Sequence, residues 1–138
     1  MIILKKIYVI LTIFLSVFII SGCGTVVKDT NVNNDKGSVI EITAEEAKKE
    51  MDKGNVIILD VRTKEEYENG HIENSILIPL DEIESEAGNI LKDKEQKILV
   101  YCRSGNRSST AANLLAKMGY NNIYDFGGIK DWPYEIVK

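Results

Sequence analysis

Two continuous apolar runs constrain the fold more than any other feature of the sequence: VIILDV at Val56–Val61 and KILVY at Lys97–Tyr101. Runs of this length that are rich in β-branched residues are typical of strands buried on both faces of a sheet. Shorter strands are predicted at Val39–Ile42, Ser75–Ile78 and Ile123–Asp125. We therefore expect a five-stranded sheet in which the two runs, the first with one acid, are buried on both faces.

Helical patterns lie between these strands. Thr43–Glu46 and Thr63–Glu66 both have the capping-box pattern, in which a threonine precedes a glutamate by three residues. The first helix should continue to about Asp52, and the second should end at Asn69-Gly70. Further helices are predicted at Glu82–Leu91, Ser108–Met118 and Ile129–Trp132, with a chain turn at Gly127-Gly128. Alternating strands and helices indicate an α/β fold, a mostly parallel sheet with helices on both faces.

The first 22 residues have the pattern of an export signal. The basic start Met1–Lys6 precedes fourteen uncharged residues, Ile7–Ile20. The following Ile20-Ser21-Gly22-Cys23 resembles the bacterial lipobox, which implies cleavage before Cys23 and lipidation of its sulfur. An uncleaved transmembrane anchor is the alternative. Both readings place the domain on the extracytoplasmic side of the cell membrane, since the lysines stay inside.

The chain is thus divided into a lipoprotein signal peptide (1–22), the lipidated cysteine with a flexible tether (23–38) and one domain (39–138). The tether is rich in Asn, Asp, Lys and Gly, and has little to bury. The chain has 17 basic and 21 acidic residues, and this acidic balance argues against a nucleic-acid partner. With one histidine and no Cys-x-x-Cys pair, we expect no metal site.

The second cysteine, Cys102, follows the buried strand Lys97–Tyr101 and precedes a predicted helix. Reactive groups of parallel sheets gather at the carboxyl ends of strands. The loop Arg103-Ser104-Gly105-Asn106-Arg107-Ser108 contains residues that let amides curl inward, and the helix start favours an anion. With Arg103 and Arg107, this setting should lower the pKa of the thiol. A buried, inert cysteine is the alternative.

The run Cys-Arg-Ser-Gly-Asn-Arg-Ser at Cys102–Ser108 resembles the active-site loop of the rhodanese family. Other blocks resemble that family in order and spacing: Leu59-Asp60-Val61-Arg62, Glu66-Tyr67, Gly70-His71-Ile72, Ile78-Pro79, Phe126-Gly127-Gly128 and Trp132. The resemblance spans about 41–134 and implies a sulfurtransferase. Cys102 would take sulfur from a small anionic donor, hold it as a persulfide in the loop 103–108, and pass it to a thiol acceptor without a cofactor.

The resemblance also implies supporting roles. Asp60 and Arg62 should brace the active loop and pair with charges such as Glu66 or Arg107, or else form a plain structural ion pair. His71 and Trp132 are interpreted as structural. Apart from the resemblance, Ser108 and Ser109 are expected to cap the helix, with contact to the sulfur as the alternative. A monomer is the default expectation.

Three other functions compete with sulfur transfer. A phosphatase or arsenate reductase would need Cys-x5-Arg, whereas Arg107 follows Cys102 after only four residues. A non-catalytic rhodanese-like binding module would not need the cysteine and arginines that this loop retains. An exported thiol-redox protein would need a resolving thiol from elsewhere, because Cys23 is expected to be lipidated.

Overall fold

The structure, a computed structural model, describes residues 37–138, so the predicted signal peptide, Cys23 and most of the tether lie outside the described residues. The described strands are β1 (Val39–Glu41), β2 (Val56–Asp60), β3 (Ser75–Leu77), β4 (Lys97–Cys102) and β5 (Ile123–Gly128). They form one sheet in the order β1-β5-β4-β2-β3, and every pairing is parallel. The expected five-stranded sheet is confirmed, and the two apolar runs form the neighbouring inner strands β2 and β4.

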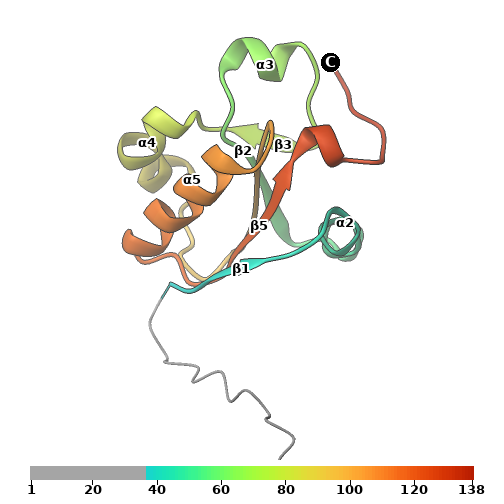
Figure 1. Ribbon diagram of the computed structural model, residues 1–138. Helices are drawn as coiled ribbons and strands as arrows, with labels where there is room; N and C mark the ends of the chain where they lie inside the picture. Colours follow the sequence, from blue (N-terminus) through green and yellow to red (C-terminus); the bar gives the residue numbers. More distant parts are fainter. Residues whose placement is uncertain (1–36) are drawn as a thin grey trace, which may run out of the picture. The chain divides into compact units, whose positions relative to one another are not determined.

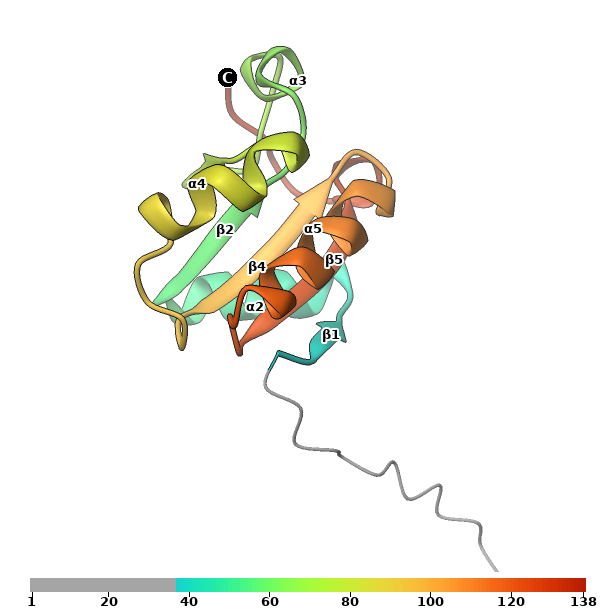
Figure 2. The same ribbon diagram turned by 90° about the vertical axis from the view of Figure 1, so that its left-hand side faces the viewer.

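The helices are α2 (Ala44–Lys53), α3 (Lys64–Glu68), α4 (Ile83–Ile90) and α5 (Asn106–Lys117), with short 3-10 turns at Leu80–Glu82 and Ile129–Asp131. Both predicted capping boxes form, at Thr43 and at Thr63. Helix α2 covers one face of the sheet, and α4 with α5 covers the other (Figures 1 and 2). Helix α3 lies beyond the carboxyl ends of the strands (Figure 1).

Alternation along the central strands divides the core between these two faces. Leu59, Val61 and Val100 pack with α4 and α5, whereas Ile58 and Leu99 pack with α2. Successive side chains of a strand point to opposite faces, so a strand covered on both sides must be apolar throughout. Cys102 belongs to the α4–α5 side of the core.

Two predicted boundaries are wrong. Helix α5 begins at Asn106 rather than Ser108, because Gly105 adopts a left-handed conformation (φ 100°) and lets the chain enter the helix at once. Strand β5 continues through Gly127-Gly128, which were expected to turn the chain. Its pairing with β4, where Cys102 lies opposite Gly128 after a register shift, extends the strand past its local turn signal.

Candidate active site

Cys102 is the last residue of β4, at the edge of the sheet where the parallel strands end. Its side chain is only 1% exposed, and three residues separate it from the first turn of α5. The backbone amide of Gly105 donates to the Cys102 sulfur at 3.1 Å. The local sequence thus places a thiol inside a tight loop whose amides face it.

Opposing effects act on the pKa of this thiol. Burial raises it, since a thiolate loses water there. The backbone amides of Ser108, Ser104 and Gly105 and the Ser108 hydroxyl lower it, and together they outweigh burial. The pKa of Cys102 therefore lies below its ordinary value, which favours the nucleophilic thiolate. The sequence predicted this direction; the structure assigns it chiefly to the loop amides.

The other loop residues divide into two groups. Arg103, Ser104 and Asn106 are exposed, so their side chains face the solvent. Arg107 is half-buried and Ser108 is fully buried. The loop therefore offers backbone amides on the inside and polar side chains on the outside.

Ser108 does not cap the helix, which corrects the prediction. The N-cap of α5 is Gly105, which has no side chain that could cap the helix. Instead the Ser108 hydroxyl lies inside the loop, donating to the carbonyl oxygens of Gly105 at 2.9 Å and of Gly127 at 3.3 Å. Ser109, also predicted as a cap, lies within the first turn of the helix. Ser108 thereby links the active loop to β5.

Arg107 reaches across to α3, where both of its terminal nitrogens donate to the Glu66 carboxylate at 2.7 and 2.8 Å. Such a two-point pair fixes orientation as well as distance. The ion pair with Arg107 lowers the pKa of Glu66 to about 2, although burial opposes the change and the Thr63 amide assists it. The guanidinium therefore stands beside the loop as a permanent positive charge.

Asp60 and Arg62 pair with each other rather than with Glu66 or Arg107. The Asp60 carboxylate is fully buried and accepts from the Arg62 guanidinium at 2.7 and 3.0 Å. Arg62 also donates to the Gly70 carbonyl oxygen at 2.7 Å. Arg62 thus joins the two ends of the segment 62–70, which contains α3, and anchors them to the buried Asp60 carboxylate. Through this segment the pair positions Glu66, which α3 presents to Arg107. The Glu66 carboxylate and, to a smaller extent, the negative charge of Asp60 raise the pKa of Arg107, so Asp60 also acts on the loop directly.

Residues at the end of β5 form a floor under the loop that sequence reasoning did not assign. A Cβ atom on Gly128 would lie 2.4 Å from the Arg103 carbonyl oxygen and 2.6 Å from the Ser104 Cα. The backbone of the active loop thus rests directly on β5. The paired glycines were a visible signal, but the sequence did not reveal what packs against them.

His71 and Trp132 lie away from the thiol in structural settings. The His71 ring stacks on Tyr67 with centroids 3.8 Å apart, and its Nδ1 lies 3.0 Å from the Tyr67 carbonyl oxygen. Trp132 packs against Phe126 in the α2 side of the core.

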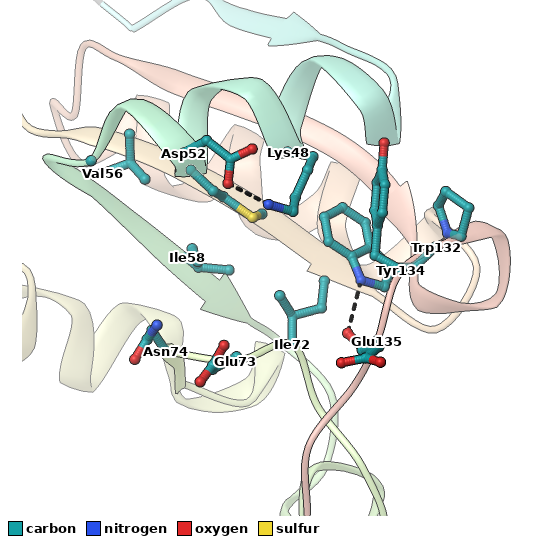
Figure 3. A pocket seen from close by; sticks show the side chains of 13 residues that line it. Lys48, Asp52, Val56, Ile58, Ile72, Glu73, Asn74, Trp132, Tyr134 and Glu135 are labelled. Carbon is teal, nitrogen blue, oxygen red and sulfur yellow. Dashed lines mark hydrogen bonds and ion pairs between the residues drawn. The ribbon is translucent and has the colours of Figure 1, made fainter.

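A groove of about 930 Å³ lies on the α2 side of the sheet (Figure 3). Its floor includes Val56, Ile58 and Ile72, and its wall includes Trp132 and Tyr134. Cys102 does not line it, because that side chain belongs to the opposite side of the core.

Within residues 37–138, no helix combines the length and the apolar character needed to cross a bilayer. The same residues hold no cluster of His, Cys, Asp and Glu arranged to bind a metal.

The fold and the site together define a class of protein: an α/β domain that holds one buried cysteine at the end of a central parallel strand, inside a loop whose amides face the thiol. The model of the rhodanese-like domain matches residues 43–134, and the chain belongs to this family. The domain of thiosulfate sulfurtransferase PspE from Escherichia coli is 37% identical over 80 residues, covering 58% of this chain and 77% of that protein.

Two further proteins extend the comparison. A putative sulfur carrier protein from Bacillus subtilis, YrkF, is 36% identical over 102 residues; the match covers 72% of this chain but only 54% of that protein. A rhodanese-related protein from Thermoplasma volcanium has a crystal structure that superposes with a TM-score of 0.63 at 32% identity, covering 71% of this chain and 97% of that one. The predicted α/β fold, a mostly parallel sheet with helices on both faces, is confirmed as the rhodanese-like fold.

Proposed function

We propose that this protein is a sulfurtransferase that carries sulfane sulfur as a persulfide on Cys102. The observation that carries the proposal is the ring of loop amides around the buried thiol, with the Gly105 amide 3.1 Å from its sulfur. The names of the Escherichia coli relative, a thiosulfate sulfurtransferase, and of the Bacillus subtilis relative, a putative sulfur carrier, support the same chemistry.

In the first step the Cys102 thiolate attacks the outer sulfur of thiosulfate. A bond forms between the two sulfur atoms, the S–S bond of thiosulfate breaks, and sulfite leaves with the bonding electron pair. In the second step an acceptor thiolate attacks the outer sulfur of the persulfide and releases Cys102 as a thiolate. A persulfide donor would load the enzyme in the same way. Both steps balance without a metal or an organic cofactor.

The loop suits the charge that moves in these steps. In the resting thiolate the negative charge lies on the Cys102 sulfur, and in the persulfide it lies one atom further out. Amides that already point inward stabilise both positions without reorganising, as they do in an oxyanion hole. The exposed Arg103 and the Glu66-bound Arg107 would attract an anionic donor.

Intact-mass spectrometry of the purified full-length protein tests the proposal. Thiosulfate should add the mass of one sulfur atom, cyanide should remove it, and Cys102→Ser should abolish it. If a persulfide donor transfers sulfur to Cys102 and thiosulfate does not, the proposed donor is wrong and the sulfurtransferase function still stands. If no sulfane donor loads a Cys102 that still reacts with an alkylating agent, the sulfurtransferase proposal is wrong.

We also propose that the domain works outside the cell membrane as a monomer, held by a lipid on Cys23. The basic start, the apolar run and the small residues before Cys23 support this location. Acyl chains hold a protein at a membrane by burying methylene groups. The wild-type protein from the membrane fraction should therefore have the mass of a chain that begins at Cys23 plus its acyl chains, and Cys23→Ser should lose the acyl chains. A wild-type protein with the mass of the full chain and no acyl chains would favour an uncleaved anchor instead.

A further inference from the structure

Asp125 is a buried carboxyl group that the proposed mechanism does not use. It lies in β5 and is 7% exposed. One carboxylate oxygen accepts from the Gly127 amide at 3.0 Å. Its neighbour across the sheet is Glu41 of β1, so a second carboxylate lies on that side. Burial of a carboxyl group costs free energy unless hydrogen bonds compensate it, so the bond from the Gly127 amide is the contact that this position depends on.

The bond from Asp125 bears directly on the floor of the active loop. Gly127 has a φ of 83°, a left-handed conformation inside a strand, and the Asp125 carboxylate holds its amide. This fixes the direction of the Gly127 carbonyl oxygen, which accepts from the Ser108 hydroxyl at 3.3 Å. It also fixes the next residue, Gly128, on which the loop backbone rests.

Ser108 connects this carboxyl group with the reactive thiol. Its hydroxyl lowers the pKa of Cys102 together with the loop amides, and it also opposes the rise that burial imposes on the pKa of Asp125. The carbonyl oxygens of Gly105 and Gly127 are the acceptors for this hydroxyl, and they hold the Ser108 side chain inside the loop. The Gly127 carbonyl therefore helps to keep Ser108 beside the loop amides that stabilise the thiolate.

We propose that Asp125 is a positioning residue for the Cys102 thiolate: by holding the Gly127 amide, it fixes the Gly127-Gly128 backbone that supports the active loop and orients the Ser108 hydroxyl. The expected effect of Asp125 on the rate of sulfur transfer rests on the proposed function, whereas its expected effect on the pKa of the Cys102 thiol does not. The role requires a hydrogen-bond acceptor at this position and does not require a negative charge.

The test compares Asp125→Ala, which removes the acceptor, with Asp125→Asn, which keeps one. The rate at which iodoacetamide alkylates Cys102 in the full-length protein is followed by peptide mass spectrometry across pH. In the Ala variant the pKa of Cys102 should rise. Alkylation at neutral pH and persulfide formation should both slow, by about three- to tenfold for one lost orienting bond. The Asn variant should stay within about twofold of wild type on the same reasoning.

Two further variants separate positioning from general damage. Asp131→Ala removes an exposed carboxylate that follows the same strand, and should leave the alkylation profile unchanged. Asp125→Ala combined with Ser108→Ala should cost less than the sum of the two single effects, because part of the Asp125 effect passes through the Ser108 hydroxyl. A wild-type alkylation profile in Asp125→Ala, an Asn variant as impaired as Ala, or fully additive effects would each overturn the proposal. The alkylation results stand even if no sulfane donor loads the enzyme.

Discussion

Replacing Gly128 by alanine should displace the active loop. The backbone of Gly128 is extended (φ −122°, ψ 143°), so alanine adopts it without strain, and only space opposes the new methyl group. That methyl would lie 2.4 Å from the Arg103 carbonyl oxygen and 2.8 Å from the Arg103 carbonyl carbon. Ordinary contact begins at 3.4 Å, so the loop backbone must move by about 1 Å. Backbone atoms cannot rotate away as the end of a flexible side chain would.

The magnitudes follow from this shift. Overpacking of a close-packed site costs about 1–3 kcal/mol of the free energy of unfolding. A misplacement of about 1 Å at the reacting atoms costs on the order of 100-fold in rate. Gly128→Ala should therefore unfold at a lower temperature and form the Cys102 persulfide about 100-fold more slowly in single-turnover measurements.

The chain offers a matched control in helix α4. An alanine Cβ at Gly88 would meet no atom within 4 Å, and this glycine does not have a positive φ. Gly88→Ala should stabilise the protein by about 0.5–1 kcal/mol and leave the rate unchanged. A Gly128→Ala variant with the wild-type unfolding temperature and rate would refute the view that β5 forms the floor of the active loop.

Three other predictions concern stability. The pKa of Glu66 is lowered from 4.5 to about 2 in the folded protein, so its pairing with Arg107 stabilises fully above pH 4.5 and this contribution should fade as pH falls toward 2. In urea unfolding, the free energy of unfolding of Glu66→Gln should therefore not fall over this pH range as that of the wild type does. The same fall in both proteins would contradict the assignment. Tyr101→Phe leaves a buried amide and the Ser75 hydroxyl without their partner, so it should lose about 1–3 kcal/mol in the same assay, and a smaller loss would show that water replaces the hydroxyl. Thr43→Ala removes the N-cap of α2 and should cost about 1 kcal/mol, measurable as a lower unfolding midpoint at unchanged m-value; no loss would mean that the capping box contributes nothing.

The strands and the capped helices could be predicted because their signals are local. The apolar run at Val56–Val61 can be buried only at the centre of a covered sheet, and each Thr-x-x-Glu pattern carries its own hydrogen-bond partners within one helical turn. The thiol could be found for a similar reason, since a cysteine that follows a buried strand and precedes a helix must lie at the edge of the sheet.

Partners that meet across the fold could not be predicted in this way. The sequence predicted a group of interacting charges at Asp60, Arg62, Glu66 and Arg107. It could not predict how they pair, because the position of α3 decides which carboxylate lies beside each guanidinium. The resulting pairs are Asp60 with Arg62 and Glu66 with Arg107.

The sequence by itself determined the parallel sheet, its layers and the position of Cys102 at the end of a buried strand, because periodicity and chain order express them directly. Only the tertiary structure decided that Ser108 turns inward and that Gly127-Gly128 continues a strand beneath the active loop. Both depend on contacts between α5 and β5, segments separated along the chain. A local turn or cap signal gives way when a distant backbone supplies better hydrogen bonds and closer packing.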